Sequence, residues 1–228
     1  MFRLLPPLLA IAGCLALPVR AATDDFEREA LGTAWELRAG DPVLADGRVH
    51  AGGDSSRLFA TYTPAAGLWS ASVDVFMDGS GAPQYGALAL GYGGQGSGAF
   101  LAVQNNGNGL RGVQYLLFYT GHNDRTGGAM QAVFGLEEVT ALRLTATLDG
   151  LRATVGLDVD FDGIPEQVLS YEYPFWVPSF GDGVGMASYG GVRLDNFTTS
   201  AVPEPQSWAL LVGGLLGLAG LRRRMRRA

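Results

Sequence analysis

Hydrophobic and polar residues alternate along much of the middle of the chain. In residues 68–77, every second position is occupied by Trp69, Ala71, Val73, Val75 and Met77. A period of two is typical of a half-buried β-strand. Similar runs occur at residues 85–92, 99–103, 113–119, 130–136, 141–148, 152–159 and 168–173. The pattern therefore predicts many short strands.

Turn-forming residues separate these runs. They occur at Asp78-Gly79, Gly93-Gly94, residues 105–109, Gly127-Gly128, Asp149-Gly150 and Asp162-Gly163. Such pairs favour tight turns between strands. No comparable stretch before residue 207 has a sustained helical period. We therefore predict an all-β fold, a sandwich or jelly roll.

The ends of this region narrow the prediction. It opens with residues 24–28 (DDFER), continues with residues 34–37 (AWEL) and closes with residues 183–199. This arrangement resembles the concanavalin A-like lectin and glucanase jelly roll, including laminin-G-like domains. The resemblance implies that the first and last strands pair. We expect Phe197 in the core, with Asp195 and Asn196 bonded to nearby backbone.

The amino terminus has the features of a secretory signal peptide. Arg3 precedes an apolar stretch at residues 4–19, and residues 19–21 (Val-Arg-Ala) form a small-residue cleavage site. Residues 1–21 are thus the predicted signal peptide. Residues 11–14 also resemble a lipobox, which would make Cys14 the lipidated first residue, but the apolar run continues beyond it. Ordinary cleavage would remove the only cysteine, so the mature protein could form no disulfide within its chain.

A second apolar segment lies near the carboxyl terminus. Residues 208–221 are uncharged and are followed by five arginines: Arg222, Arg223, Arg224, Arg226 and Arg227. As a helix, this segment would cover about 21 Å of a hydrocarbon core about 30 Å thick. It is therefore a short candidate transmembrane helix, with the arginines on the cytoplasmic side.

The order of features at this end is specific. Pro203, Glu204 and Pro205 precede the apolar segment and the arginine cluster. This order resembles the PEP-CTERM sorting signal, which implies cleavage by an exosortase and an association with exopolysaccharide and biofilm. A plain single-pass anchor is the alternative. The predicted organisation is a signal peptide (1–21), a β-sandwich domain (22–201) and a sorting signal (202–228).

The charge of the middle segment excludes one class of partner. Residues 23–202 contain nine arginines and 21 carboxylates, which gives a formal charge of −12. Such a surface repels phosphate backbones, so we expect no nucleic-acid partner.

The residue pattern does not predict an enzyme. Glucanases of the resembled fold use a Glu-x-Asp-x-x-Glu strand, and the sequence has no such spacing. Glu137 and Glu138 are adjacent, Glu172 stands alone, and His50 and His122 lie far apart. We expect no catalysis. A glycan-active enzyme with an unrecognised site remains the alternative, as does a purely structural matrix component.

Two stretches offer chemistry for binding a glycan. The first contains Tyr119 and the polar residues His122, Asn123, Asp124 and Arg125. The second is residues 171–180, in which Trp176 lies between two prolines. Aromatic faces beside polar groups suit sugar binding. A solvated loop and a hydrophobic plug, respectively, are the alternatives that we favour.

One acidic stretch resembles part of a calcium loop. Asp158, Asp160 and Asp162 are spaced as in an Asp-x-Asp-x-Asp-Gly loop, and Glu166 could complete an irregular site. Position twelve is Leu169, so this is not an EF-hand. We favour an ordinary hairpin, with Val155, Leu157, Val159 and Phe161 in the core and the three aspartates in water. Calcium is the candidate cofactor of the alternative.

Together these observations predict an exported, noncatalytic protein of the cell surface or extracellular matrix, associated with exopolysaccharide and biofilm. Its expected partners are an exosortase, an exopolysaccharide or other glycan, and, transiently, the inner membrane.

Overall fold

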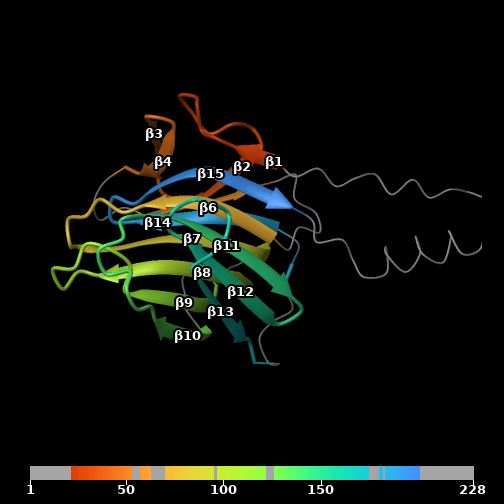
Figure 1. Ribbon diagram of the computed structural model, residues 1–228. Coiled ribbons are helices and arrows are strands. Elements are labelled where there is room, and N and C mark those ends of the chain that lie inside the picture. The colour runs from red at the N-terminus through yellow and green to blue at the C-terminus, as the bar shows by residue number, and fades with distance from the viewer. Residues whose placement is uncertain are drawn as a thin grey trace, which may run out of the picture.

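The computed structural model describes residues 22–52, 57–62, 70–94, 97–121, 126–174, 180–181 and 183–200. These residues form fifteen β-strands and no helix. The strands make two antiparallel sheets that pack face to face (Figure 1). The predicted all-β jelly roll is confirmed.

The first sheet has eight strands. They run in the order β13-β12-β11-β6-β15-β4-β3, with β1 paired to β15 outside this path. Their bounds are β1 (Ala22–Asp24), β3 (Pro42–Ala45), β4 (Arg48–Ala51), β6 (Ser70–Phe76), β11 (Ala141–Asp149), β12 (Arg152–Asp158), β13 (Gln167–Glu172) and β15 (Arg193–Ser200).

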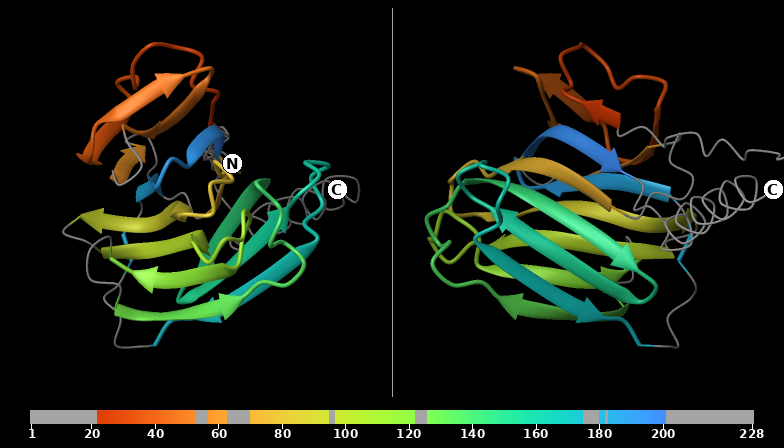
Figure 2. Two further views of the ribbon diagram at one scale, coloured as in Figure 1. Left: turned by 90° about the vertical axis from the view of Figure 1, so that its left-hand side faces the viewer. Right: turned by 45° about the vertical axis from the view of Figure 1, so that its right-hand side comes forward.

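The second sheet has seven strands in the order β10-β9-β8-β7-β14-β5-β2. Their bounds are β2 (Trp35–Ala39), β5 (Arg57–Tyr62), β7 (Pro83–Gly94), β8 (Ser97–Asn106), β9 (Tyr115–Thr120), β10 (Thr126–Ala132) and β14 (Gly183–Tyr189). In Figure 2, strands β7 to β10, yellow to green, lie in one layer, and β11 to β13, green to teal, lie in the other.

The core lies between the two sheets and follows the predicted alternation. Val73 and Val75 enter it from the eight-stranded sheet, and Leu88 and Leu101 enter it from the other. Phe197 is buried as predicted, and its ring centroid lies 4.8 Å from that of Trp35. Burial of these side chains is the main driving force for the two sheets to pack together.

The first and last strands pair, as the resemblance implied. Ala22 lies opposite Thr199, and Asp24 lies opposite Phe197. The Asp24 carboxylate accepts hydrogen bonds from Arg28 (2.6 Å) and from the Trp35 indole (2.7 Å). Burial raises the pKa of Asp24, but these donors outweigh it and leave the pKa below its usual value. These bonds tie Asp24, at the end of β1, to Arg28 and Trp35.

The prediction of a turn at Gly127-Gly128 is wrong. Both residues belong to β10, where the register with β9 shifts between Thr126 and Ala129. A Cβ at position 128 would overlap the carbonyl oxygen of Phe118 in β9. Glycine here permits close approach of two backbones within a β-bulge rather than a chain reversal. The predicted strand at residues 130–136 accordingly ends at Ala132.

Strands β3 and β4 were not predicted, because each has only four residues. Their turn residues, Asp46 and Gly47, have φ values of 53° and 67°. Positive φ at both central positions is the requirement of a type I′ hairpin turn, which Asp-Gly satisfies. The turn signal was present, but the flanking alternation was too short to identify strands.

The expectation for the Asp195-Asn196 pair holds for one residue and fails for the other. The Asp195 carboxylate accepts the backbone N–H of Asn196 at 2.7 Å, as expected. The Asn196 side chain instead donates to the Asp74 carboxylate at 2.9 Å. Asn196 has a φ of 48° at a register shift between β15 and β6, so the bulge directs its side chain across the sheet.

Candidate functional site

An eight-residue loop at residues 159–166 joins β12 to β13, where a tight hairpin was expected. Asp158 ends β12 and is only 1 % exposed, so the prediction that all three aspartates face water is wrong for Asp158. Phe161 was expected in the core; instead it has a φ of 62° and is half-buried in the loop. The loop folds back over β12, so that Pro165 lies against Gly156 of that strand.

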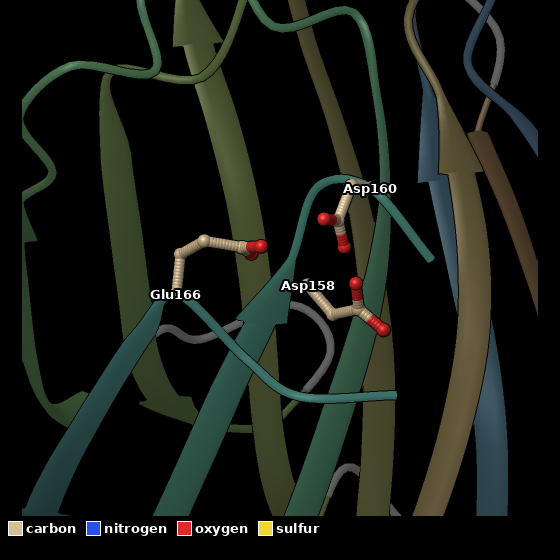
Figure 3. A group of neighbouring side chains, drawn as sticks. All are labelled: Asp158, Asp160 and Glu166. Atoms are coloured by element: carbon tan, nitrogen blue, oxygen red, sulfur yellow. The ribbon is translucent and has the colours of Figure 1, made fainter. Parts of the chain in front are cut away.

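Three carboxylates converge at the end of β12. Asp158, Asp160 and Glu166 each place one oxygen within 4.8 Å of the others (Figure 3). Two oxygens that bind one calcium ion at about 2.4 Å can be no farther apart than about 4.8 Å. The three residues therefore fit a calcium-sized cation. The structure does not bring the fourth predicted ligand, Asp162, into this group.

Backbone N–H groups hold the three carboxylates in place. Asp158 Oδ2 accepts the N–H of Gly163 at 2.9 Å, and Glu166 Oε2 accepts that of Val159 at 2.8 Å. Asp160 Oδ1 accepts the N–H of Asp162 at 3.2 Å. Each carboxylate thus keeps one further oxygen that these bonds do not use.

The unused oxygen of Asp158 is the main evidence that the site binds a cation. Asp158 Oδ1 is buried and has no hydrogen-bond partner within the described part of the chain. A buried carboxylate oxygen without a partner costs about 1–3 kcal/mol or more, because it has lost its water. A bound cation would remove this cost.

The charges of the loop also favour a bound cation. The backbone N–H of Asp162 lowers the pKa of Asp160, but desolvation and the charges of Asp162, Glu166 and Asp158 outweigh it. The net result is a pKa above the usual value. A positive charge among these carboxylates would reverse the repulsion.

A stack of arginine and phenylalanine side chains lies beside the acidic loop. Arg143 lies 5.7 Å from the centre of the Phe161 ring, which stacks on Phe76 at 6.4 Å. Arg48 covers Phe76 at 3.7 Å. Asp74 holds Arg143 through two hydrogen bonds of 2.7 and 3.0 Å. This stack fixes Phe161, and hence the loop, on the outer face of the eight-stranded sheet.

The outer face of the seven-stranded sheet carries a separate aromatic cluster. The ring centroids of Phe59 and Phe100 are 5.1 Å apart, although strands β7 and β14 lie between their strands. Ala87 and Ala187 occupy the intervening strands in the same cluster. Their small side chains leave room for the two rings to meet above the sheet.

A tyrosine–amide strip crosses the same face. It comprises Tyr115 of β9, Gln104 of β8, Tyr85 of β7 and Tyr189 of β14, each directly opposite the next. The rings of Tyr85 and Tyr189 stack, with centroids 5.7 Å apart. Gln104 donates to the side chain of Asn106. The strip therefore places two stacked tyrosine rings beside a pair of amides.

Of the predicted glycan-binding residues, only Tyr119 lies among the described residues. It belongs to the aromatic cluster and stacks on Phe100 at 5.4 Å. Its carbonyl oxygen accepts the Tyr173 hydroxyl at 3.4 Å, so one residue of each predicted stretch lies at this place. His122, Asn123, Asp124, Arg125 and Trp176 lie outside the described residues, as do Pro203, Glu204 and Pro205.

Sequence analysis did not identify the tyrosine–amide strip. Its four residues come from four strands, and only the cross-strand register places them in a row. A signal was nevertheless present. Residues 85, 104 and 189 lie on the outer face of the sheet, where Tyr85 is buried and Gln104 and Tyr189 are half-buried, yet they are aromatic or amide residues where charged ones are common.

Comparison with known families identifies the carboxyl terminus. The model of the PEP-CTERM protein-sorting motif matches residues 201–224, which include Pro203, Glu204 and Pro205. The chain thus carries a PEP-CTERM sorting motif, which indicates an exported protein that is sorted through the membrane. No curated protein matches the sequence. Among the described residues, no helix is long and apolar enough to cross a membrane.

Solved structures similar to this chain confirm the lectin-like jelly roll. The Ca²⁺/Man3GlcNAc-bound exoplasmic/lumenal domain of VIP36 aligns with a TM-score of 0.56 and 11 % identity, covering 79 % of this chain and 88 % of that one. Lectin II from Ulex europaeus gives 0.54 and 10 %, covering 79 % and 97 %. The apo Crh5 transglycosylase gives 0.52 and 13 %, covering 80 % and 85 %.

Proposed function

We propose that this protein is an exported, noncatalytic glycan-binding module that an exosortase processes at its sorting motif. The observation that carries the glycan proposal is the tyrosine–amide strip formed by Tyr115, Gln104, Tyr85 and Tyr189. Sugar rings stack on aromatic faces, while amide groups bond to their hydroxyls. The strip offers both on one face. Two of the similar structures are lectins or lectin-like domains, which supports the same proposal.

The strip crosses the outer face of the sheet, where Tyr115, Gln104 and Tyr189 are half-buried and Tyr85 is buried. Its members lie across four neighbouring strands, and strands in a sheet are about 4.8 Å apart. A row of four positions thus spans about 14 Å, which accommodates several sugar units of a polysaccharide. We propose that the ligand is an exopolysaccharide of the biofilm in which the protein resides.

The noncatalytic part of the proposal rests on the chemistry of the strip. Its four residues include no carboxylate, whereas most glycosidases use a pair of carboxyl groups beside the scissile bond. The likeness to a transglycosylase concerns the fold. Incubation of the protein with polysaccharides, followed by a reducing-sugar assay, should show no release of new ends. Reproducible release would contradict this part and favour a glycan-active enzyme.

The glycan site is tested with the Tyr189→Ala variant. Loss of one stacking face should weaken binding to neutral polysaccharides roughly tenfold, as measured by affinity electrophoresis or a glycan array. Phe134→Ala is the matched control, because Phe134 is a 77 % exposed aromatic residue outside the strip. Equal binding by Tyr189→Ala, Phe134→Ala and the unmodified protein would contradict the assignment.

We also propose that the cation of the acidic loop is calcium. Its ligands would be Asp158, Asp160 and Glu166, all of which supply oxygen, the donor that calcium prefers. An extracellular protein meets calcium at concentrations that suit weak sites. Saturating calcium should raise the melting temperature by on the order of 5 °C, and Asp158→Asn should abolish the rise. Identical melting curves with calcium and with chelator would refute this proposal.

A further inference from the structure

We infer that the calcium at Asp158, Asp160 and Glu166 is open to a ligand and binds the carboxylates of an acidic polysaccharide. The inference rests on the calcium site proposed above. It gives that site a partner, and it gives the sandwich a second glycan-binding surface on the sheet opposite the tyrosine–amide strip.

The number of protein ligands leaves the ion incomplete. Calcium takes six to eight oxygen ligands. The loop already uses one oxygen of each carboxylate to accept the backbone N–H of Gly163, Asp162 or Val159. If each carboxylate gives the ion only its remaining oxygen, three to five of the six to eight positions are left for water, backbone carbonyls or oxygens of a ligand.

The burial of the three carboxylates determines from which side a ligand can reach the ion. Asp158 is buried and has one oxygen without a hydrogen-bond partner, so it forms the buried side of the three-carboxylate group. Asp160 and Glu166 are exposed, and in Figure 3 the Asp160 carboxylate lies above that of Asp158 while the Glu166 carboxylate lies to their left. A ligand could therefore approach the ion from solvent without any rearrangement of the sheet.

The charge of the molecule favours calcium as the bridge to an anionic polymer. The middle segment carries a formal charge of −12, so it repels a polyanion at a distance. At the loop, a divalent cation would offset much of the local negative charge. In the adjoining stack, the guanidinium group of Arg48 adds positive charge on the same face, whereas Asp74 neutralises that of Arg143.

The neighbouring aromatic rings complete a surface suited to sugars. Phe76 and Phe161 are both half-buried and lie nearly parallel, with an angle of 15° between their planes. Because Arg48 and Phe161 cover the ring of Phe76, a uronate whose carboxylate binds the ion would lie against the edge of this stack. The chemistry thus selects a carboxylate-bearing sugar over a neutral one.

Two surfaces on opposite sheets would make one molecule bivalent. The acidic loop follows β12 in the eight-stranded sheet, whereas the tyrosine–amide strip lies on the outer face of the seven-stranded sheet. A protein that holds one polymer on each face cross-links the two, and repeated contacts along a chain add avidity.

The test uses the mature protein and trigalacturonate, a short probe that carries three carboxylates. Calorimetric titration in millimolar calcium should show binding that chelator abolishes and that neutral methyl-esterified trigalacturonate does not reproduce. Asp160→Asn and Glu166→Gln should each reduce the affinity at least tenfold. Asp162→Asn removes a charge from the same loop but no carboxylate from the three-carboxylate group, so it should reduce the affinity by less than either of these two changes. Tyr189→Ala should bind like the unmodified protein, because its site lies on the other sheet.

The outcomes separate this inference from the proposals on which it rests. If calcium raises the melting temperature but trigalacturonate does not bind, the ion is a closed structural one and the inference is wrong. Binding that persists in chelator would also overturn it. If calcium has no effect on melting, the calcium proposal and this inference fail together, while binding of neutral glycans to the strip is judged separately by Tyr189→Ala.

Discussion

At the scale of single residues, the outer face of the eight-stranded sheet places charged side chains side by side. Asp195 and Asp74 lie directly opposite each other in β15 and β6, and Arg143 lies opposite both Asp74 and Asp158. Arg143 satisfies Asp74 through a bidentate ion pair. The Asp195 carboxylate accepts a backbone N–H, but it remains next to a like charge.

The pKa of Asp195 reflects this position. Burial raises the pKa first, and the charge of Asp74 raises it further, against the lowering effects of the Asn196 N–H and Arg48. A carboxyl group with a raised pKa in the folded state destabilises that state when it is ionised. The cost is absent below the pKa of the unfolded chain, near 3.8, and is fully present above the folded-state pKa.

Asp195→Asn should therefore stabilise the protein at neutral pH. The amide keeps the acceptor for the Asn196 N–H and removes the charge opposite Asp74. Removing a like-charge pair of this kind is worth about 0.2–1 kcal/mol, a rise in melting temperature of roughly 1–3 °C. The rise should disappear near pH 3, where Asp195 is already neutral. Thermal melts of both proteins at pH 7 and pH 3 measure it, and a lower melting temperature at pH 7 would contradict the argument.

At the scale of elements, the sequence was sufficient where a strand is long and alternates. It predicted β6, β11 and β13 close to their observed bounds because more and less buried positions alternate along each of them. It was insufficient where a neighbouring strand determines the structure. Gly127-Gly128 reads as a turn by composition, but the close backbone of Phe118 makes it a bulge. Asp158 reads as exposed by alternation, but the returning loop buries it.

Gly128→Ala tests the bulge. A Cβ would overlap the Phe118 carbonyl and lie 2.6 Å from the Tyr119 Cα, and neither backbone atom can move without disturbing β9. We expect a loss of about 1–3 kcal/mol in the free energy of unfolding, measured by denaturant titration. Gly52→Ala is the control, because a Cβ there meets its nearest atoms at 3.5 and 3.6 Å, which is ordinary contact. If residues 127–128 formed a turn instead of a bulge, Gly128→Ala and Gly52→Ala would change the free energy of unfolding equally.

At the scale of the whole molecule, the candidate sites were partly predictable. The acidic loop is contiguous in sequence, so its ligands could be named from spacing alone, except that Asp162 lies outside the group. The tyrosine–amide strip draws on β7, β8, β9 and β14, residues that lie up to about a hundred positions apart. No local pattern encodes such a row, because strand order decides it.

The pairing of β1 with β15 brings both ends of the sandwich together, so Ala22 and Thr199 lie opposite each other. The matched sorting motif follows at once, since Pro203 is only three residues beyond the last strand residue, Ser200. Three extended residues reach about 10 Å. An exosortase that cuts near Pro203, Glu204 and Pro205 would therefore work next to the folded sheet and leave the sandwich intact.

We accordingly expect the extracellular protein to begin at Ala22 and to end near residues 203–205, without residues 208–228. Mass spectrometry of intact protein from the cell exterior measures both ends. The precursor in the inner membrane should retain the apolar segment and the arginine cluster, and it should accumulate in cells that lack exosortase. Extracellular protein with an intact arginine-rich tail would show that the segment is a plain anchor, and a lipid on Cys14 would show that the lipobox is used instead of the predicted cleavage site.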